Sequence, residues 1–166
     1  EIQSIIGSDR LPSMSDKPSM IYTSATLMEI QRVASIVIPI GAVHRSVIDS
    51  EVNGHRIPQD TLVAAQLGSA MQNEKIFNDH GLFIPERFIN ADGKTINKDM
   101  TDYLIPFGVG KRQCAGEGLA RMELFLVFTS IIQKYRIEPT DGGLDMGYDY
   151  TIMKVPRSNT FKLSRI

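Results

Sequence analysis

The sequence is short of the residues that build several common kinds of site. Its single cysteine rules out a disulfide within the chain, and a zinc site needs more ligands than the sequence gathers together. Only three histidines occur and none are spaced as His-x-x-x-His, so a histidine metal site is not expected. A net charge of −1 argues against a nucleic-acid partner held by phosphate attraction. No apolar run reaches the ~20 residues that span a bilayer, and no signal-peptide pattern opens the chain.

The composition that remains is that of a folded chain. Hydrophobic residues make up 42% of the sequence, which suits a globular core and argues against disorder. At 166 residues, the chain has the length of one domain or of a part of one.

The one cysteine lies in a glycine-rich loop that leads into a long apolar helix. The loop reads Phe107-Gly108-Val109-Gly110-Lys111-Arg112-Gln113-Cys114-Ala115-Gly116. Amide N–H groups and the positive end of a helix dipole favour thiolate over thiol at such a place. Glycines also allow a close approach of the backbone to a flat ligand. The pattern indicates a metal ligand or a nucleophile at Cys114; the alternative is a buried cysteine acting as a small hydrophobic residue.

Three motifs in the chain occur in an order typical of one family. Phe107, Gly110, Arg112, Cys114 and Gly116 fill every fixed position of Phe-x-x-Gly-x-Arg-x-Cys-x-Gly. Upstream, Glu29-Ile30-Gln31-Arg32 fits Glu-x-x-Arg, and Pro85-Glu86-Arg87-Phe88 fits Pro-Glu-Arg-Phe. In these motifs the sequence resembles the cytochrome P-450 family of haem-thiolate monooxygenases. The loop and its helix most resemble the microsomal drug-metabolising branch of animals.

The resemblance implies a mainly α fold with small β-sheets (α+β), of which residues 1–166 form the C-terminal haem-binding portion. The chain begins with Glu1, and the family's N-terminal membrane anchor and oxygen-activating helix have no counterpart in it. We therefore expect a fragment of a longer protein, inactive alone. The parent is expected to lie at the cytosolic face of the endoplasmic reticulum membrane. There it would insert one atom of O2 into a lipophilic small molecule, with electrons from an NADPH-dependent reductase.

The resemblance also implies roles for residues around the cofactor. Haem b (iron protoporphyrin IX) would bind through the Cys114 thiolate, whose electron donation favours O–O cleavage. Phe107 would shield the sulfur, and Gly108, Gly110 and Gly116 would let the backbone approach the ring. Arg112 would meet a haem propionate. His44 stands where the family places another propionate partner, although a lone histidine is more often an incidental surface or core residue.

Glu29 and Arg32 lie three residues apart, so they share a helix face and can pair. Taken alone, such a pair predicts a solvated ion pair worth under ~1 kcal/mol. The resemblance instead implies a buried network in which Arg32 and Arg87 share the Glu29 carboxylate. Its role would be to hold the loop beneath the haem, without taking part in the chemistry.

Substrate and partner contacts are implied only by the resemblance. The expected substrate-facing residues are Ile38, Ile40, Ala42, Thr151 and Ile152, and ordinary core positions are an equal alternative for the first three. A basic group around the loop fits an acidic redox partner on the proximal face, although any single lysine is more often part of a scattered solvated surface. This group consists of Lys98, Lys111, Arg112 and Arg121.

Periodicity predicts a helix over Met20–Ala34. A second helix is predicted over Gly116–Tyr135, because Glu117 and Lys134 complement the dipole at its two ends and Pro139 blocks its continuation. Its segment Leu124–Phe128 is apolar all round, which predicts burial on most sides, and we expect the second helix to pack on the first.

Asn53-Gly54 predicts a type I′ turn between the arms Val43–Val52 and Arg56–Leu67. The remaining predicted elements are the end of a helix near Ile2–Ile6, an extended Ile36–Ile40, a short helix or helical turn over Gln72–Asp79, a surface loop from Asp92 to Asp99, and strands at Tyr135–Glu138, Tyr148–Lys154 and Thr160–Arg165.

Two other functional classes remain open at this point. One is a truncated, non-enzymatic chain that binds haem poorly or not at all, which the full reading frame would reveal. The other is a thiolate-haem isomerase or dehydratase that needs no reductase, which the oxygen-activating helix of the parent would distinguish.

Overall fold

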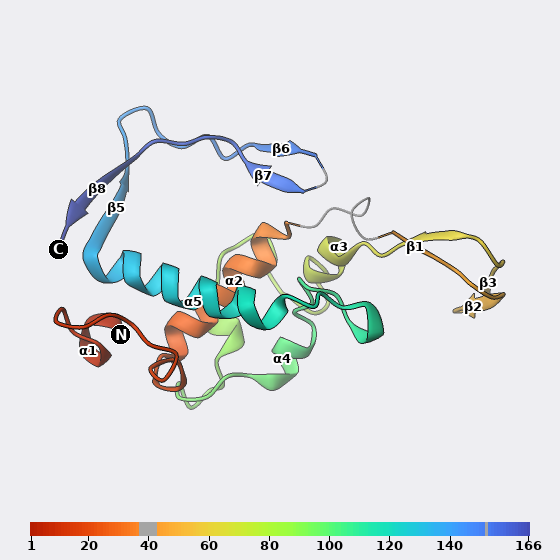
Figure 1. The fold of residues 1–166 in the computed structure, drawn as a ribbon, viewed down its shortest axis with the longest axis horizontal. Coiled ribbons are helices and arrows are strands. Elements are labelled where there is room, and N and C mark those ends of the chain that lie inside the picture. Colours follow the sequence, from red (N-terminus) through yellow and green to blue (C-terminus); the bar gives the residue numbers. More distant parts are fainter. Residues whose placement is uncertain (37–42, 152) are drawn as a thin grey trace.

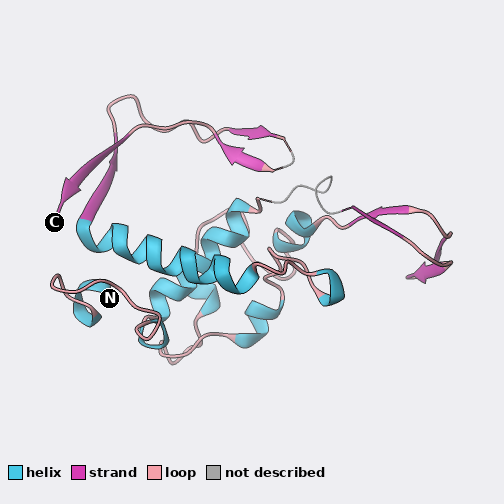
Figure 2. Cartoon of the chain, in the orientation of Figure 1, coloured by secondary structure: helices cyan, strands magenta, loops and turns pink. Residues whose placement is uncertain are grey.

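In the computed structural model of the protein, a helical centre carries pairs of β-strands at its two ends (Figures 1 and 2). The structure describes residues 1–36, 43–151 and 153–166. The helices are α1 (Ile2–Ile5), α2 (Ile21–Ala34), α3 (Leu67–Met71), α4 (Lys98–Asp102) and α5 (Glu117–Lys134), with 3₁₀ turns η1 (Lys17–Ser19), η3 (Pro85–Phe88) and η4 (Gly110–Arg112). The strands are β1 (Val43–Arg45), β2 (Ser50–Val52), β3 (His55–Ile57), β4 (Leu62–Ala64), β5 (Tyr135–Pro139), β6 (Tyr148–Tyr150), β7 (Lys154–Pro156) and β8 (Phe161–Arg165). The predicted α+β class is confirmed.

Helix α2, predicted within one residue of its observed start, contributes to both hydrophobic clusters of the core. The first cluster lies between α2 and the segment that follows α3, and comprises Ala25, Met71, Phe77, Phe88 and Leu104. The second lies between α2 and α5, and comprises Ile6, Met20, Leu27 and Phe125. A helix that buries two sides in this way has its position fixed by both halves of the chain.

The first turn of α2 is capped by a residue from outside the helix. One oxygen of the Glu1 carboxylate accepts the N–H of Tyr22 at 3.0 Å, and the other accepts the N–H of Thr23 at 2.7 Å and its hydroxyl at 2.6 Å. These bonds satisfy amide donors that have no partner within the helix, and a negative charge is favoured at this end of the dipole. The other end of α2 closes at Ser35, which adopts a left-handed φ of 41°.

Helix α5 forms where the sequence predicts it and packs on α2. The prediction that α5 is buried on most sides is wrong for the described residues. Only one stripe, Phe125, Thr129 and Gln133, is buried, whereas Leu119 and Val127 are 58% and 57% exposed. The physical reason is that α1 and α2 contact one side of this uniformly apolar helix, and no described element covers the opposite side.

The hairpin predicted around Asn53-Gly54 is confirmed. Asn53 and Gly54 have φ values of 49° and 80°, as a type I′ turn requires, and β2 pairs with β3 on either side of them. The outer arms, β1 and β4, form a second short ladder. Between the ladders the Ser46 hydroxyl donates to the carbonyl of Pro58 and accepts from the N–H of Thr61, so side-chain bonds interrupt the pairing.

The C-terminal strands differ in one respect from the prediction. β5 pairs with β8 over five residues, close to the predicted bounds. The single strand expected over Tyr148–Lys154 is instead the antiparallel pair β6–β7, because the Thr151 N–H donates to the Met153 carbonyl and reverses the chain.

The expected helical turn in Gln72–Asp79 is present, since Phe77 N–H donates to the Asn73 carbonyl, but the regular helix α3 lies before it. Of the segment Ile36–Ile40, only Ile36 is among the described residues.

None of the helices in the described ranges has the length and apolar character needed to cross a membrane.

The packing of α5 on α2 depends on Phe125, whose side chain is fully buried. We predict that Phe125→Ala lowers the free energy of unfolding by about 3–5 kcal/mol, since it removes buried apolar area and leaves a cavity. Urea unfolding of the polypeptide that carries this chain measures the change. Val47→Ala, at a residue that is 79% exposed between β1 and β2, is the control and should change stability by less than about 0.5 kcal/mol. Equal effects of the two substitutions would contradict the burial of Phe125.

Candidate functional site

The Cys114 loop folds back on itself before α5 begins. The N–H of Cys114 donates to the carbonyl of Phe107 at 2.9 Å, which closes the loop across its base. Gly108 and Gly110 both have φ near 77°, a region that favours glycine over other residues. A β-carbon at Gly110 would meet no atom within 4 Å, so glycine is needed there for its backbone angle.

The sulfur of Cys114 is an exposed free thiol on this loop. A β-carbon placed on Gly116 would lie 3.8 Å from Sγ, so any larger side chain at this position would extend beside the sulfur. The loop therefore presents an uncrowded sulfur with little side-chain bulk around it. This arrangement fits the approach of a flat ligand to Sγ. The loop supplies a sulfur donor and, in its glycines, the lack of side chains that such an approach requires. Within the described ranges, no group of three or more His, Cys, Asp and Glu side chains is placed to hold a bare metal ion.

The ring of Phe107 is half-buried and is covered on one face by Arg121 of α5. The guanidinium carbon of Arg121 lies 5.2 Å from the ring centroid, within the range of a cation–π contact. Arg121 Nε also donates to the Glu117 carboxylate at 2.7 Å, one helical turn earlier. The contact joins the loop to the helix that follows it. The sequence predicts Arg121 only as a member of a basic surface group, although its i,i+4 spacing from Glu117 indicates an ion pair on the helix.

The two expected propionate partners lie apart from this contact. Arg112 is exposed in η4, two residues before the cysteine. His44 is exposed in the middle of β1, opposite Val63 on β4. The structure brings neither into a side-chain hydrogen bond with another described residue, and their assignment stays a prediction.

The other expected group, Glu29 with Arg32, is fully buried on α2. Arg32 donates from Nε to one oxygen of Glu29 at 2.7 Å and from Nη2 to the other at 2.8 Å, a bidentate pair. The side chains are 1% and 0% exposed, so the pair is not the solvated ion pair that its spacing alone predicts. Arg87 from η3 adds a third member, since its Nε donates to Glu29 Oε1 at 3.2 Å.

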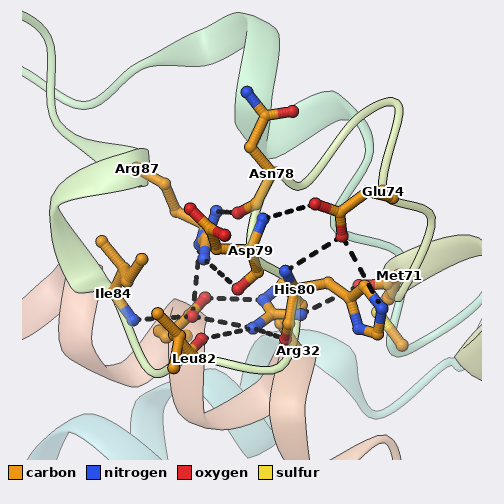
Figure 3. Close-up of polar contacts among 10 residues, drawn as sticks. Arg32, Met71, Glu74, Asn78, Asp79, His80, Leu82, Ile84 and Arg87 are labelled. Carbon is orange, nitrogen blue, oxygen red and sulfur yellow. Dashed lines mark hydrogen bonds and ion pairs between the residues drawn. The ribbon is translucent and has the colours of Figure 1, made fainter.

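Backbone groups complete this network, and Figure 3 shows them converging on the two arginines. Arg32 donates to the carbonyls of Met71, His80 and Leu82, and its guanidinium lies 5.4 Å from the ring centroid of Phe77. Arg87 donates to the carbonyls of Asn78 and Asp79, and Glu29 accepts the N–H of Ile84 at 2.9 Å. The network thus joins α2 to the irregular segment between α3 and η3. The sequence motifs did not identify these carbonyls, because a backbone acceptor leaves no mark in residue type.

Burial of Glu29 raises the pKa of its carboxyl group. Hydrogen bonds from Arg32 and Ile84, and the positive charges of Arg32 and Arg87, act in the opposite direction and outweigh it. The pKa of Glu29 therefore lies below its ordinary value, and the carboxylate is ionised at neutral pH.

The residues expected to face substrate are less well placed. Ile38, Ile40, Ala42 and Ile152 lie outside the described residues. Thr151 is exposed at the turn between β6 and β7. An apolar cavity of about 360 Å³ lies between the end of α2 and this hairpin, and its walls include Ala34, Ile36 and Val155. No residue of the Cys114 loop lines it.

The network predicts a large effect of Glu29→Gln on stability. Without the carboxylate, two guanidinium groups stay buried without their counter-charge, which costs on the order of 3–5 kcal/mol of unfolding free energy. Denaturant unfolding of the polypeptide that carries this chain measures it. Glu51→Gln in the exposed strand β2 is the control and should have an effect below about 0.5 kcal/mol. A loss below about 1 kcal/mol for Glu29→Gln would contradict the network's contribution.

The effect of this substitution should also depend on pH. A carboxyl group with a lowered folded-state pKa stabilises the protein fully above its unfolded pKa of roughly 4.3. That contribution is lost as the pH falls through the folded-state value. The stability difference between the native protein and Glu29→Gln should therefore be greatest near neutral pH and shrink in acid. Unfolding curves between pH 3 and pH 7 measure it, and a difference that grows on acidification would contradict the lowered pKa.

Comparison with known proteins places these features in a family. The family model described as Cytochrome P450 matches residues 1–163. Similar curated proteins include Cytochrome P450 2U1 of Homo sapiens, 42% identical over 81% of this chain and 24% of the relative. Cytochrome P450 2B2 of Rattus norvegicus is 44% identical over 82% of the chain and 27% of the relative. The chain spans about a quarter of the length of these relatives. On the match over nearly all of its residues, the chain belongs to the cytochrome P450 family.

Proposed function

We propose that residues 1–166 are the C-terminal haem-binding portion of a haem-thiolate monooxygenase. The observation that carries the proposal is the Cys114 sulfur, exposed on a loop that fills all five fixed positions of the family motif. The proposed cofactor is haem b, with Cys114 as the axial thiolate ligand. When bound, the haem supplies the activation of O2, from which one oxygen atom enters the substrate.

The residues of the loop have separate roles in this proposal. Cys114 binds the iron, and the lack of side chains at Gly108, Gly110 and Gly116 lets a macrocycle approach the sulfur closely; a β-carbon at Gly116 would already lie 3.8 Å from Sγ. The half-buried ring of Phe107 limits the access of water to the proximal side of the sulfur. Amide groups that follow Cys114 would donate to the thiolate, which would tune the iron's potential.

Arg112 and His44 are the proposed partners of the two haem propionates. Both side chains are exposed, so each is available to meet a carboxylate. A guanidinium and a carboxylate form short, charge-assisted hydrogen bonds that fix orientation as well as adding affinity. These contacts would set the angle of the haem about the Fe–S bond.

The proposed electron source is an NADPH-dependent reductase that docks beside the loop. Lys98, Lys111 and Arg112 supply the positive charge, and two of them lie within the loop itself. Charge complementarity of this kind increases the association rate and is sensitive to salt. The proposed location is the cytosolic face of the endoplasmic reticulum membrane, with the anchor in polypeptide that precedes this chain.

The proposed substrate is a lipophilic small molecule. Support comes from the apolar cavity at the end of α2, whose wall includes Ile36. Residues 37–42, which contain the candidate substrate contacts Ile38, Ile40 and Ala42, begin directly after it. Thr151 and Ile152 at the β6–β7 turn are the other candidates. The cavity wall thus includes the residue that directly precedes, in sequence, the segment to which substrate contacts are assigned in this proposal.

The proposal that the chain is part of a larger catalytic domain rests on two observations. The matched relatives are about four times as long as the region they share with this chain. The outer side of α5 is also apolar and exposed, with Leu119 and Val127 among its residues. We expect the 166 residues alone to have no monooxygenase activity, since they leave the sulfur exposed and enclose no substrate against it.

The test is the Soret spectrum of the reduced, CO-bound parent protein. Thiolate ligation gives a red-shifted band that histidine ligation does not give. We predict that Cys114→Ser abolishes this band, because a serine hydroxyl does not replace the anionic sulfur donor. Ala115→Ser adds the same hydroxyl one residue later and should keep the band. The same spectrum from the parent and the Cys114→Ser protein would overturn the proposal.

A further inference from the structure

We propose that Arg121 is a positioning residue that fixes the place of the Cys114 sulfur by holding the ring of Phe107. The inference deepens the proposed function, on which it rests for the role of the sulfur. It starts from three contacts of one guanidinium group. Nε donates to Glu117 at 2.7 Å, Nη1 donates to Gln31 on α2 at 3.4 Å, and the planar face covers Phe107 at 5.2 Å.

Phe107 is connected to the residue that carries the sulfur through the backbone of the loop. The carbonyl of Phe107 accepts the N–H of Cys114 at 2.9 Å, so the two residues are held together at the base of the loop. A shift of the Phe107 ring moves its backbone and, through this hydrogen bond, the backbone of Cys114. The other backbone bonds of the loop span only three residues each, from Gly108 N–H to the Ile105 carbonyl and from Gln113 N–H to the Gly110 carbonyl.

The contact between Arg121 and Gln31 connects the loop to the rigid part of the fold. Gln31 is the residue before Arg32, and both belong to the helix that the buried network holds in place. Arg121, itself on α5, therefore contacts both the loop, through Phe107, and α2, through Gln31. A guanidinium suits this position because it can donate in its plane and stack on an aromatic ring at the same time, which an ammonium group does not do.

A role in docking the reductase fits these contacts less well. The side chain of Arg121 is 30% exposed, and the carboxylate of Glu117 neutralises its charge at 2.7 Å. An arginine used for long-range attraction would present its charge to solvent. Lys98 and Lys111 are exposed and meet that requirement better.

The test uses Arg121→Lys in the full-length protein, since this variant keeps the charge and loses the planar fork. We expect amide hydrogen exchange in residues 107–116 to rise about 3–10-fold, because an ammonium group cannot hold Glu117, Gln31 and the Phe107 ring at once as the planar fork does. The fraction of reduced, CO-bound haem with the thiolate-type Soret band should fall, while the global unfolding midpoint stays near that of the native protein. Arg136→Lys, the same change at an exposed arginine of β5, should alter none of these.

Exchange in residues 107–116 that matches the native protein would overturn the proposal and leave Arg121 with a docking role. A loss of global stability together with unchanged local exchange would overturn it as well. Should Arg121→Lys not fold, Phe107→Leu removes the same contact from the other side and should raise loop exchange in the same way. The exchange measurement does not need bound haem. An error in the role given to Arg121 can therefore be told apart from an error in the haem assignment, which the Cys114→Ser spectrum tests.

Discussion

One buried carboxylate, that of Glu29, holds together parts of the fold that have little else to order them. An ionised group in a protein interior costs several kcal/mol unless its charge is compensated and its oxygens are hydrogen-bonded. Arg32, Arg87 and the N–H of Ile84 meet both requirements. The arginines in turn bond to backbone carbonyls between residues 71 and 82. A segment built mainly of turns is thereby ordered by side chains.

The network also explains why α2 can serve as a fixed reference for the rest of the chain. Its position is set by ion pairs on one turn, by hydrophobic clusters on two sides, and by the Glu1 carboxylate at its N-terminus. Removal of any one of these would leave the others in place. The loop that carries Cys114 has no comparable set of restraints of its own, so its geometry depends on contacts with α5 and α2.

The sequence predicts those features of the structure that depend on neighbouring residues. The bounds of α2 follow from periodicity, and those of α5 follow from the charges at its ends and from Pro139 past its end. The turn at Asn53-Gly54 follows from backbone angles that these two residues favour. Features that depend on distant partners are predicted less well. Spacing pairs Glu29 with Arg32, whereas Arg87 enters only through a family motif. The exposed side of α5 was not predicted, because a helix apolar all round does not indicate which side is covered.

The Glu29 network is buried, whereas the Cys114 sulfur is exposed. This difference follows from the space that a flat ligand requires around the sulfur. Close approach to Sγ requires little side-chain bulk around it, and the loop meets this with glycines. Glycines also leave a backbone with many accessible conformations, and a ligand atom is useful only in a defined place. Order therefore has to come from outside the loop, through the ring of Phe107 and the helix against which it packs. The residues that supply rigidity and those that leave space around the sulfur are therefore different residues.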